Sequence, residues 1–263
     1  MKEKLFVVKI GGNVIDNDTF LNKFLAEFAQ IKAHKILIHG GGKVATQIGE
    51  RLGIQAQMVD GRRITDKETL EVVTMVYGGL VNKKVVSILQ ANNCNAAGFT
   101  GADANVIEAH KRPVKTVDYG FVGDVDAVNG PFLQTIINFG ITPILAPLTH
   151  DKTGNMLNTN ADTIASTVAV EMSKYYDTQL VYCFELKGVL KDFEDKDSVI
   201  THINPAFYSE LKELGIISKG MIPKLDNSFD AINAGVSAVS ICHADDLAQI
   251  TAGAPKGTKL AKN

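Results

Sequence analysis

The sequence has little cysteine, few prolines, no excess of either charge and no long apolar run. Its 27 Lys and Arg residues nearly balance its 29 Asp and Glu residues, which leaves a formal net charge of -2. A general nucleic-acid-binding protein carries a basic excess, so the balance excludes nucleic acid as a general partner. The 7 prolines form no Pro/Ser-rich linker, and no repeat or low-complexity tract occurs. Any two lobes must therefore share one sheet or pack tightly against each other.

The three cysteines, Cys94, Cys183 and Cys242, are odd in number and widely spaced. This pattern suits neither a disulfide framework nor a metal site, so we expect buried free thiols in a reducing compartment. No stretch approaches the roughly 18 apolar residues of a membrane span. The first apolar run is too short for a signal peptide. We therefore expect a cytoplasmic protein without a membrane partner.

The length and the apolar pattern favour one large α/β domain. A chain of 263 residues fits one such domain or two coupled lobes. Short apolar runs alternate with longer amphipathic stretches, which is typical of βαβ units and a mostly parallel sheet. We treat 1–263 as one domain with a soft boundary between lobes 1–175 and 176–263.

Two predicted strands end in glycine turns that open helices. The strand 5–10 leads into Gly11 and Gly12, and the strand 35–40 ends in the glycines at 40–42. Backbone N–H groups unobstructed by a Cβ can approach an anion closely at a helix N-terminus, so these turns favour phosphate binding. Alternatively, the glycines merely permit tight turns. Neither turn has the pattern of a P-loop or a Rossmann dinucleotide site.

Charged side chains accompany these turns. Lys9 lies within an apolar strand, where an ammonium group is costly unless an anion or a carboxylate pairs with it. A lysine beside a glycine turn suits stabilisation of a phosphoryl group, although a lysine at a strand end could also reach water. Asp162 could serve only the start of a helix. Lys224 could be a solvated surface lysine.

Several local structures follow from short patterns. The segment 60–64 predicts a hairpin, whose two arginines could form a polar tip or bind a carboxylate or phosphate. Thr65 and Glu68 have the spacing of a capping box. Pro223 restricts the residue before it, so we expect the helix that carries Lys224 to begin at Pro223 or later. We also expect one strand over 141–148 and a short helix as the last element.

Six motifs follow one another along nearly the whole chain: K-I-G-G at 9–12, H-G-G-G at 39–42, G-R-R-I-T at 61–65, N-T-N-A-D at 158–162, K-G-V-L at 187–190 and G-M-I-P-K at 220–224. In this order the chain resembles the amino acid kinase family. The resemblance implies an open three-layer αβα sandwich around a mainly parallel central sheet. It is strongest to members in which ATP phosphorylates the side-chain carboxylate of N-acetyl-L-glutamate, the second step of arginine biosynthesis.

The resemblance implies a catalytic set of Lys9, Lys224, Asp162, Gly12 and Gly41. The two lysines would stabilise the transferring phosphoryl group, Asp162 would hold both lysines, and the glycine N–H groups would cradle that group. A glutamate-like carboxylate is ionised at pH 7, because its reference pKa is about 4.3, so it needs no general base. The absence of a recognisable catalytic dyad is then expected.

The resemblance also assigns residues to the two substrates. Arg63 would bind the α-carboxylate of the acyl amino acid, Asn158 its α-carboxylate and amide region, and Gly41 and Gly42 its backbone. ATP would bring Mg²⁺ held by its phosphates and water rather than by protein ligands. The residues implied for ATP are Lys9, Gly11, Glu185, Leu186, Lys187, Gly188, Val189, Leu190, Ile216, Ile217, Ser218 and Lys224.

Three points leave the function open. The strand before the turn at 187–188 reads CFE, where many relatives carry a Ser/Thr-Asp pair. Few residues precede the first strand, too few for the N-terminal helix through which arginine-inhibited relatives form hexamers, so we expect an arginine-insensitive homodimer. Alternatives to the N-acetyl substrate are N-succinyl-L-glutamate, the acceptors carbamate, aspartate or uridylate, and a noncatalytic sensor of nucleotide or amino acid.

Overall fold

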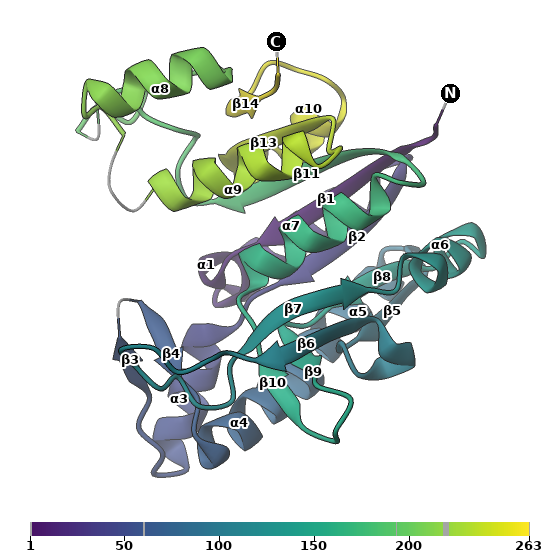
Figure 1. The fold of residues 1–263 in the computed structure, drawn as a ribbon. Coiled ribbons are helices and arrows are strands. Elements are labelled where there is room, and N and C mark those ends of the chain that lie inside the picture. The colour runs from purple at the N-terminus through teal and green to yellow at the C-terminus, as the bar shows by residue number, and fades with distance from the viewer. Residues whose placement is uncertain (1, 60, 193, 218–220, 263) are drawn as a thin grey trace.

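A sheet of eight strands forms the centre of the molecule (Figure 1). The computed structural model describes residues 2–59, 61–192, 194–217 and 221–262. Neighbouring strands of the sheet are parallel except for one antiparallel pair at one side. Helices cover both faces, so the predicted αβα sandwich with a mainly parallel sheet is confirmed. In spatial order the strands are β12 (His202–Ile203), β14 (Thr258–Leu260), β13 (Ala238–His243), β11 (Asp177–Phe184), β1 (Lys4–Ile10), β2 (His34–His39), β8 (Thr142–Leu145) and β5 (Ala96–Phe99).

Two layers of helices bury their apolar faces against this sheet. Alternate side chains of β1 serve the two faces: Leu5 and Val7 join one core cluster, Phe6 and Val8 the other. The Leu5 side is covered by α6 (Gly130–Asn138), α7 (Ala161–Met172), α8 (Pro205–Glu213) and α9 (Ile222–Asn233). The Phe6 side is covered by α1 (Gly12–Ile15), α2 (Asp18–Ala29), α3 (Gly42–Arg51), α4 (Lys67–Val73), η1 (Thr74–Val81), α5 (Asn82–Ala91) and α10 (Leu247–Thr251). Two short turns, η2 (Asp103–Asn105) and η3 (Ala244–Asp246), complete the helical elements of the described residues.

A small sheet and a hairpin lie beside the sandwich. The small sheet has the order β10 (Met156–Asn158), β9 (Leu148–His150), β6 (Ile107–Lys111), β7 (Gly123–Val128). The predicted hairpin is confirmed as the antiparallel pair β3 (Gln57–Val59) and β4 (Arg62–Ile64). Thr65, which follows β4, donates its N–H to Tyr119 O at 2.9 Å and accepts from Phe121 N at 2.7 Å. These bonds fix the hairpin against the segment that precedes β7.

The helices α4, η1 and α5 form one 25-residue helix that is long and apolar enough to span a membrane, with a mean hydropathy of 1.4 over its most apolar stretch. This helix was not predicted as a candidate span, and two adjacent lysines, Lys83 and Lys84, interrupt its apolar run. Lys84 pairs with Asp18 at 2.6 Å, and Val85 and Leu89 lie in the core cluster on the Phe6 side. The helix is therefore packed as a core helix of this fold.

Two predicted helix starts were wrong by one residue. The N-cap of α4 is Asp66, whose side chain accepts from Thr69 N at 2.8 Å, because Thr65 is engaged with the neighbouring segment. The helix α9 begins at Ile222, with Pro223 in its first turn. The preference against a helical residue before proline is a bias, and here the helix overrides it.

One predicted strand was also wrong, and another strand was missed. The expected strand 141–148 is divided into β8 and β9, which belong to different sheets. Pro147 lies between them and has no N–H to donate to a sheet. The short helix expected near the end is present as α10, but it is followed by the strand β14, which was not predicted. This strand has three residues, too few to show an alternating pattern. The prediction of buried free thiols is confirmed, since all three cysteines are buried and none forms a disulfide.

Candidate active site

The two glycine turns lie side by side at the carboxyl ends of β1 and β2. These strands are parallel neighbours with Ile10 opposite His39, and Gly40 N donates to Ile10 O at 3.2 Å. Gly11 is the N-cap of α1 and Gly41 the N-cap of α3. Both helices therefore point their N-terminal N–H groups at one edge of the sheet, as anion binding requires.

Gly41 is the most constrained residue of the two turns. Its φ of 145° lies in a region that other residues rarely adopt, and an added Cβ would lie 3.1 Å from the Tyr77 ring. The turn therefore needs glycine for its backbone conformation and for the close approach of Tyr77.

Lys9, Asp162 and Lys224 form a charged cluster beside these turns. Lys9 Nζ lies 2.7 Å from Asp162 Oδ1, and Lys224 Nζ lies 3.1 Å from Asp162 Oδ2. The three residues come from β1, the first turn of α7 and α9, so distant parts of the sequence converge here. Lys9 is 8% exposed, in agreement with the prediction of a buried and paired charge. The carboxylate holds together two ammonium groups that would otherwise repel each other.

The surroundings of the cluster shift its charges. Burial acts to raise the pKa of Asp162, but the charges of Lys9 and Lys224 outweigh burial and the pKa is lowered. Burial lowers the pKa of Lys224, against the opposing effect of Asp162. The ring centroid of Phe184 lies 5.1 Å from Lys9 Nζ and 3.7 Å from Lys224 Nζ, within reach of cation–π attraction. Asp162 is therefore ionised at neutral pH, and an aromatic face supports both lysines.

A cavity of about 550 Å³, the first cavity, opens beside the cluster. Its wall includes both glycine turns, Lys9, Lys224 and the end of β11 with the turn that follows it. Glu185, Leu186 and Gly188 of that turn line the cavity, as do the glycines of both strand ends. The N-terminal backbone of two helices, three lysines (Lys9, Lys43 and Lys224) and apolar side chains such as Leu186 thus surround one space.

A second cavity of about 710 Å³ adjoins the first and shares with it Lys224 and residues 40–42. Asp162 lines only the second cavity and Lys9 only the first. The charged cluster therefore lies at the boundary between them. A ligand in one cavity can meet a ligand in the other at this shared wall.

Arg63 and Asn158, both predicted to bind an amino acid, lie together on the wall of the second cavity. Arg63 Nη2 donates to Gly42 O at 2.9 Å and to Thr46 Oγ1 at 2.8 Å. Asn158 Nδ2 donates to Thr65 Oγ1 at 3.0 Å. These bonds orient both side chains on the wall of the second cavity.

Other residues implied for ATP lie outside both cavity walls. Lys187 forms an exposed ion pair with Asp197. Val189, Leu190 and Ile217 are buried in or near the core, and Ile216 is half-buried. Ser218 lies outside the described residues.

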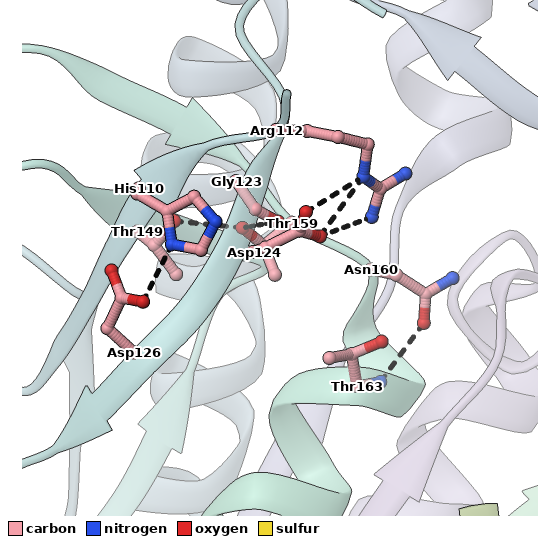
Figure 2. Close-up of polar contacts among 9 residues, drawn as sticks. All are labelled: His110, Arg112, Gly123, Asp124, Asp126, Thr149, Thr159, Asn160 and Thr163. Carbon is pink, nitrogen blue, oxygen red and sulfur yellow. Dashed lines mark hydrogen bonds and ion pairs between the residues drawn. The ribbon is translucent and has the colours of Figure 1, made fainter. Parts of the chain in front are cut away.

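Sequence reasoning missed three residues that shape the site, Phe184, Tyr77 and Arg112, and gave no role to a fourth, Asn160. Asn160 Oδ1 accepts from the N–H groups of Asp162 and Thr163, which caps α7 and places Asp162 in its first turn (Figure 2). Arg112, on the wall of the second cavity, forms an ion pair with Asp124 (Figure 2). The N-T-N-A-D motif contained Asn160. No pattern marked the other three, because they reach the site through tertiary packing.

The described residues contain no group of three His, Cys, Asp or Glu side chains that could hold a metal ion. A ligand of these cavities that needs a divalent cation must therefore supply most of its coordination itself.

Comparisons with known proteins place these observations in context. Residues 4–243 match the amino acid kinase family. A protein of Cytophaga hutchinsonii named acetylglutamate kinase is 62% identical over 263 residues, which cover 99% of this chain and 100% of that protein. A Bacteroides fragilis protein with the same name is 59% identical over 241 residues, 92% of each chain.

Two solved structures have a similar fold. The crystal structure of smu.665 from Streptococcus mutans UA159 covers 100% of both chains with a TM-score of 0.77 and 26% identity. N-acetylglutamate synthase from Neisseria gonorrhoeae, complexed with coenzyme A and N-acetyl-glutamate, has a TM-score of 0.83 and 20% identity. That match covers 99% of this chain and 60% of the synthase chain, and it supports the fold alone.

Proposed function

The chain belongs to the amino acid kinase family, and we propose that it transfers the γ-phosphoryl group of ATP to the side-chain carboxylate of N-acetyl-L-glutamate, the second step of arginine biosynthesis. The observation that carries this proposal is the meeting of two cavities at residues 40–42 and Lys224, with a Lys-Asp-Lys cluster at the boundary. The acceptor follows from full-length relatives named acetylglutamate kinase at 59–62% identity.

The reaction needs no general base. The acceptor carboxylate is ionised at neutral pH, because its reference pKa is about 4.3, so its oxygen attacks the γ-phosphorus directly and ADP leaves. Negative charge is spread over the transferring group throughout. The protein therefore has to align the two substrates and stabilise that charge.

Lys9 and Lys224 are the proposed stabilising groups. Lys9 reaches the transferring group from the strand side, and Lys224 reaches it from α9. Asp162 keeps both ammonium groups at the boundary of the cavities, and the N–H groups of Gly12 and Gly41 complete the cradle. Each such donor is worth on the order of 10² to 10³ in rate.

The first cavity is the proposed ATP site. Lys9, Gly11 and Lys224 would face the phosphates, and Glu185, Leu186 and Gly188 would lie along the rest of the nucleotide. The proposed ATP set also includes Lys187, Val189, Leu190, Ile216, Ile217 and Ser218. These residues would contact ATP through the segments of chain to which they belong.

We propose that Mg²⁺ enters with ATP. The donor set of the described residues lacks a carboxylate cage, which suits a cation held by phosphate oxygens and water. When bound, the cation neutralises phosphate charge. The lysines and glycine turns then have only the remaining charge of the transferring group to stabilise.

The second cavity is the proposed site of the acyl amino acid. Arg63 and Asn158 would bind the α-carboxylate, because a guanidinium fork matches a planar carboxylate. Gly41 and Gly42 would contact the backbone of the substrate. In this assignment residues 1–175 supply the acyl-amino-acid lobe and residues 176–263 the nucleotide lobe.

We further propose a cytoplasmic homodimer. Three buried free thiols suit a reducing compartment. Met75 and Leu80 are 56% and 52% exposed on η1, and a second copy of the chain would cover them. Gel filtration with light scattering would give the mass of a dimer, and a monomer would contradict this proposal.

Release of ADP tests the function. Purified protein with ATP and Mg²⁺ is expected to turn over N-acetyl-L-glutamate, and hydroxylamine should trap the acyl phosphate as a hydroxamate. L-glutamate, aspartate, carbamate, uridylate and N-succinyl-L-glutamate serve as parallel acceptors. Turnover with none of them would overturn the proposal in favour of a noncatalytic role.

A further inference from the structure

The second cavity contains a cation that neither the reacting carboxylate nor the α-carboxylate requires. Besides Arg62, Arg63 and Lys224, Arg112 lies on its wall, directly after β6. We propose that Arg112 binds an oxygen atom of the N-acyl group and so makes the site select acylated over free glutamate. This inference rests on the proposed function, because it assigns a binding residue to the N-acyl group of the same acceptor.

The backbone places Arg112 away from the proposed α-carboxylate site. Val122, on the cavity wall, is bridged to Asn158 on one side. On its other side, Val122 O accepts from Arg112 N at 2.8 Å. Asn158 in turn contacts Thr65, which directly follows β4, the strand that carries Arg63. The order across this wall is therefore Arg63 and Thr65, then Asn158 and Val122, then Arg112.

The α-carbon of an acylated glutamate carries three substituents that need a place. The side-chain carboxylate must reach the glycine turns and Lys224, where the two cavities meet. The α-carboxylate lies at Arg63 and Asn158. The corner formed by Val122 and Arg112 suits the acyl group, because it offers an apolar surface for the carbon atoms of that group and a donor for its oxygen.

The guanidinium of Arg112 is oriented before any ligand arrives. Its Nε donates to Asp124 Oδ1 at 3.0 Å and its Nη2 to the same oxygen at 2.6 Å. The Tyr119 ring centroid lies 5.7 Å from the guanidinium carbon. Figure 2 shows the third nitrogen of Arg112 turned away from Asp124. That nitrogen carries two N–H groups available to a ligand.

Asp124 also determines what kind of acceptor suits this nitrogen. Its carboxylate balances the charge of Arg112, so the free edge presents oriented N–H donors next to an already neutralised pair. Asp124 itself does not line the cavity, whereas Arg112 does. A purely structural ion pair between β6 and β7 would not need its free edge on the cavity wall. The free edge suits a carbonyl oxygen, and it also suits a carboxylate oxygen at the end of a longer acyl chain.

Substitution of Arg112 tests this inference through substrate discrimination. In Arg112→Gln, kcat/KM for N-acetyl-L-glutamate should fall about tenfold or more, as expected for a lost hydrogen bond to a charged donor. The KM for ATP should stay within about twofold. L-glutamate, tested as a substrate or as a competitive inhibitor, should change by less than about twofold, because it lacks the acyl group.

Three variants and one further substrate sharpen the test. Lys111→Gln removes a positive charge from the neighbouring exposed residue, which does not line the cavity, and should leave all constants unchanged. Asp124→Asn should give a smaller loss than Arg112→Gln, with the same selectivity for acylated substrates. Arg112→Lys should restore part of the lost kcat/KM. Equal losses with N-acetyl- and N-succinyl-L-glutamate assign the carbonyl oxygen, and a larger loss with the succinyl compound assigns its terminal carboxylate.

Two results would overturn the inference. One is unchanged kinetics in Arg112→Gln, and the other is a loss with L-glutamate as large as with the acylated substrates, which would mean that Arg112 serves the α-carboxylate or the fold. Failure of the proposed function is distinguishable from both, because it would be seen in the unsubstituted protein.

Discussion

The two cavities share one wall but differ in their cations. The cations of the first are the lysines Lys9, Lys43 and Lys224, whereas the second shares Lys224 and adds the arginines Arg62, Arg63 and Arg112. An ammonium group is a compact charge on a flexible stem, and a guanidinium is a rigid fork that matches a planar carboxylate. The lysines of the first cavity therefore suit a phosphoryl group that moves during transfer. The arginines of the second cavity suit substrate groups that stay in place.

The two cavities also differ in what builds them. The first depends on the ends of β1, β2 and β11, which are central strands buried on both faces. The second depends on the hairpin β3–β4 and on the small sheet beside the sandwich. Substitutions around the second cavity can therefore change which acceptor is selected, and they disturb the core less than substitutions around the first.

Loss of a lysine at the boundary should have the largest effect. In Lys9→Ala and Lys224→Ala, kcat should fall on the order of 10² to 10³ fold, because each removes a donor to the transferring group. The KM for N-acetyl-L-glutamate should change little. Steady-state kinetics with both substrates varied would measure this. A rise of KM alone would mean that the lysines bind substrate without stabilising the transition state, and the contrast between the cavities would break.

Loss of the arginine at the α-carboxylate should have the opposite kinetic signature. In Arg63→Gln, the KM for N-acetyl-L-glutamate should rise about tenfold to a hundredfold, since a charged fork to a carboxylate is lost. The KM for ATP and kcat at saturation should change by less than about threefold. The same kinetic series measures it, with Lys111→Gln as the control. A main effect on kcat would place Arg63 among the groups that stabilise the reaction.

Neutralising the carboxylate at the boundary should have a small effect on the free energy of unfolding, and one that depends on pH. The pKa of Asp162 is lowered in the folded protein, so its stabilisation is complete above its unfolded pKa of about 3.9 and is lost as the pH falls through the folded pKa. Asp162→Asn should lower the free energy of unfolding by about 1–2 kcal/mol at pH 7. This difference should shrink below about pH 4.

Urea unfolding between pH 3 and pH 7 would measure that difference. Asp245→Asn is a matched control, because Asp245 pairs with Lys23 in an exposed ion pair and lines neither cavity, and it should change stability by less than about 0.5 kcal/mol. A difference for Asp162→Asn that stays constant down to pH 3 would contradict the role of the two lysines.

Sequence reasoning predicted the parts of the site that depend on local pattern. A lysine inside an apolar strand, glycines after strands and an acidic residue at a helix start each have a local physical reason. Lys9, Gly41 and Asp162 could therefore be singled out from the sequence, and the fold brings Lys9 and Asp162 into contact. The alternating apolar runs likewise predicted the mainly parallel sheet.

The missed features depend on contacts between distant segments. Phe184 supports two lysines from β1 and α9, and nothing in its own segment indicates that role. Arg112 reaches the second cavity because β6 pairs with β7 and with the residues before it. The cap of α4 moved from Thr65 to Asp66 because Thr65 was engaged by a segment more than fifty residues away. Local spacing carries no information about such pairings.

The hydrogen-bonded pairing of β1 with β2 fixes the distance between these two strands, and side chains cannot alter that distance. Neighbouring strands of a sheet lie about 4.8 Å apart whatever residues they carry, and Ile10 and His39 are paired directly before the two glycine turns. The separation of the two turns is thus a property of the backbone. A chain with this topology can change its acceptor by altering the arginine-lined cavity. The position at which the phosphoryl group is transferred stays fixed, because it is set by the pairing of β1 with β2.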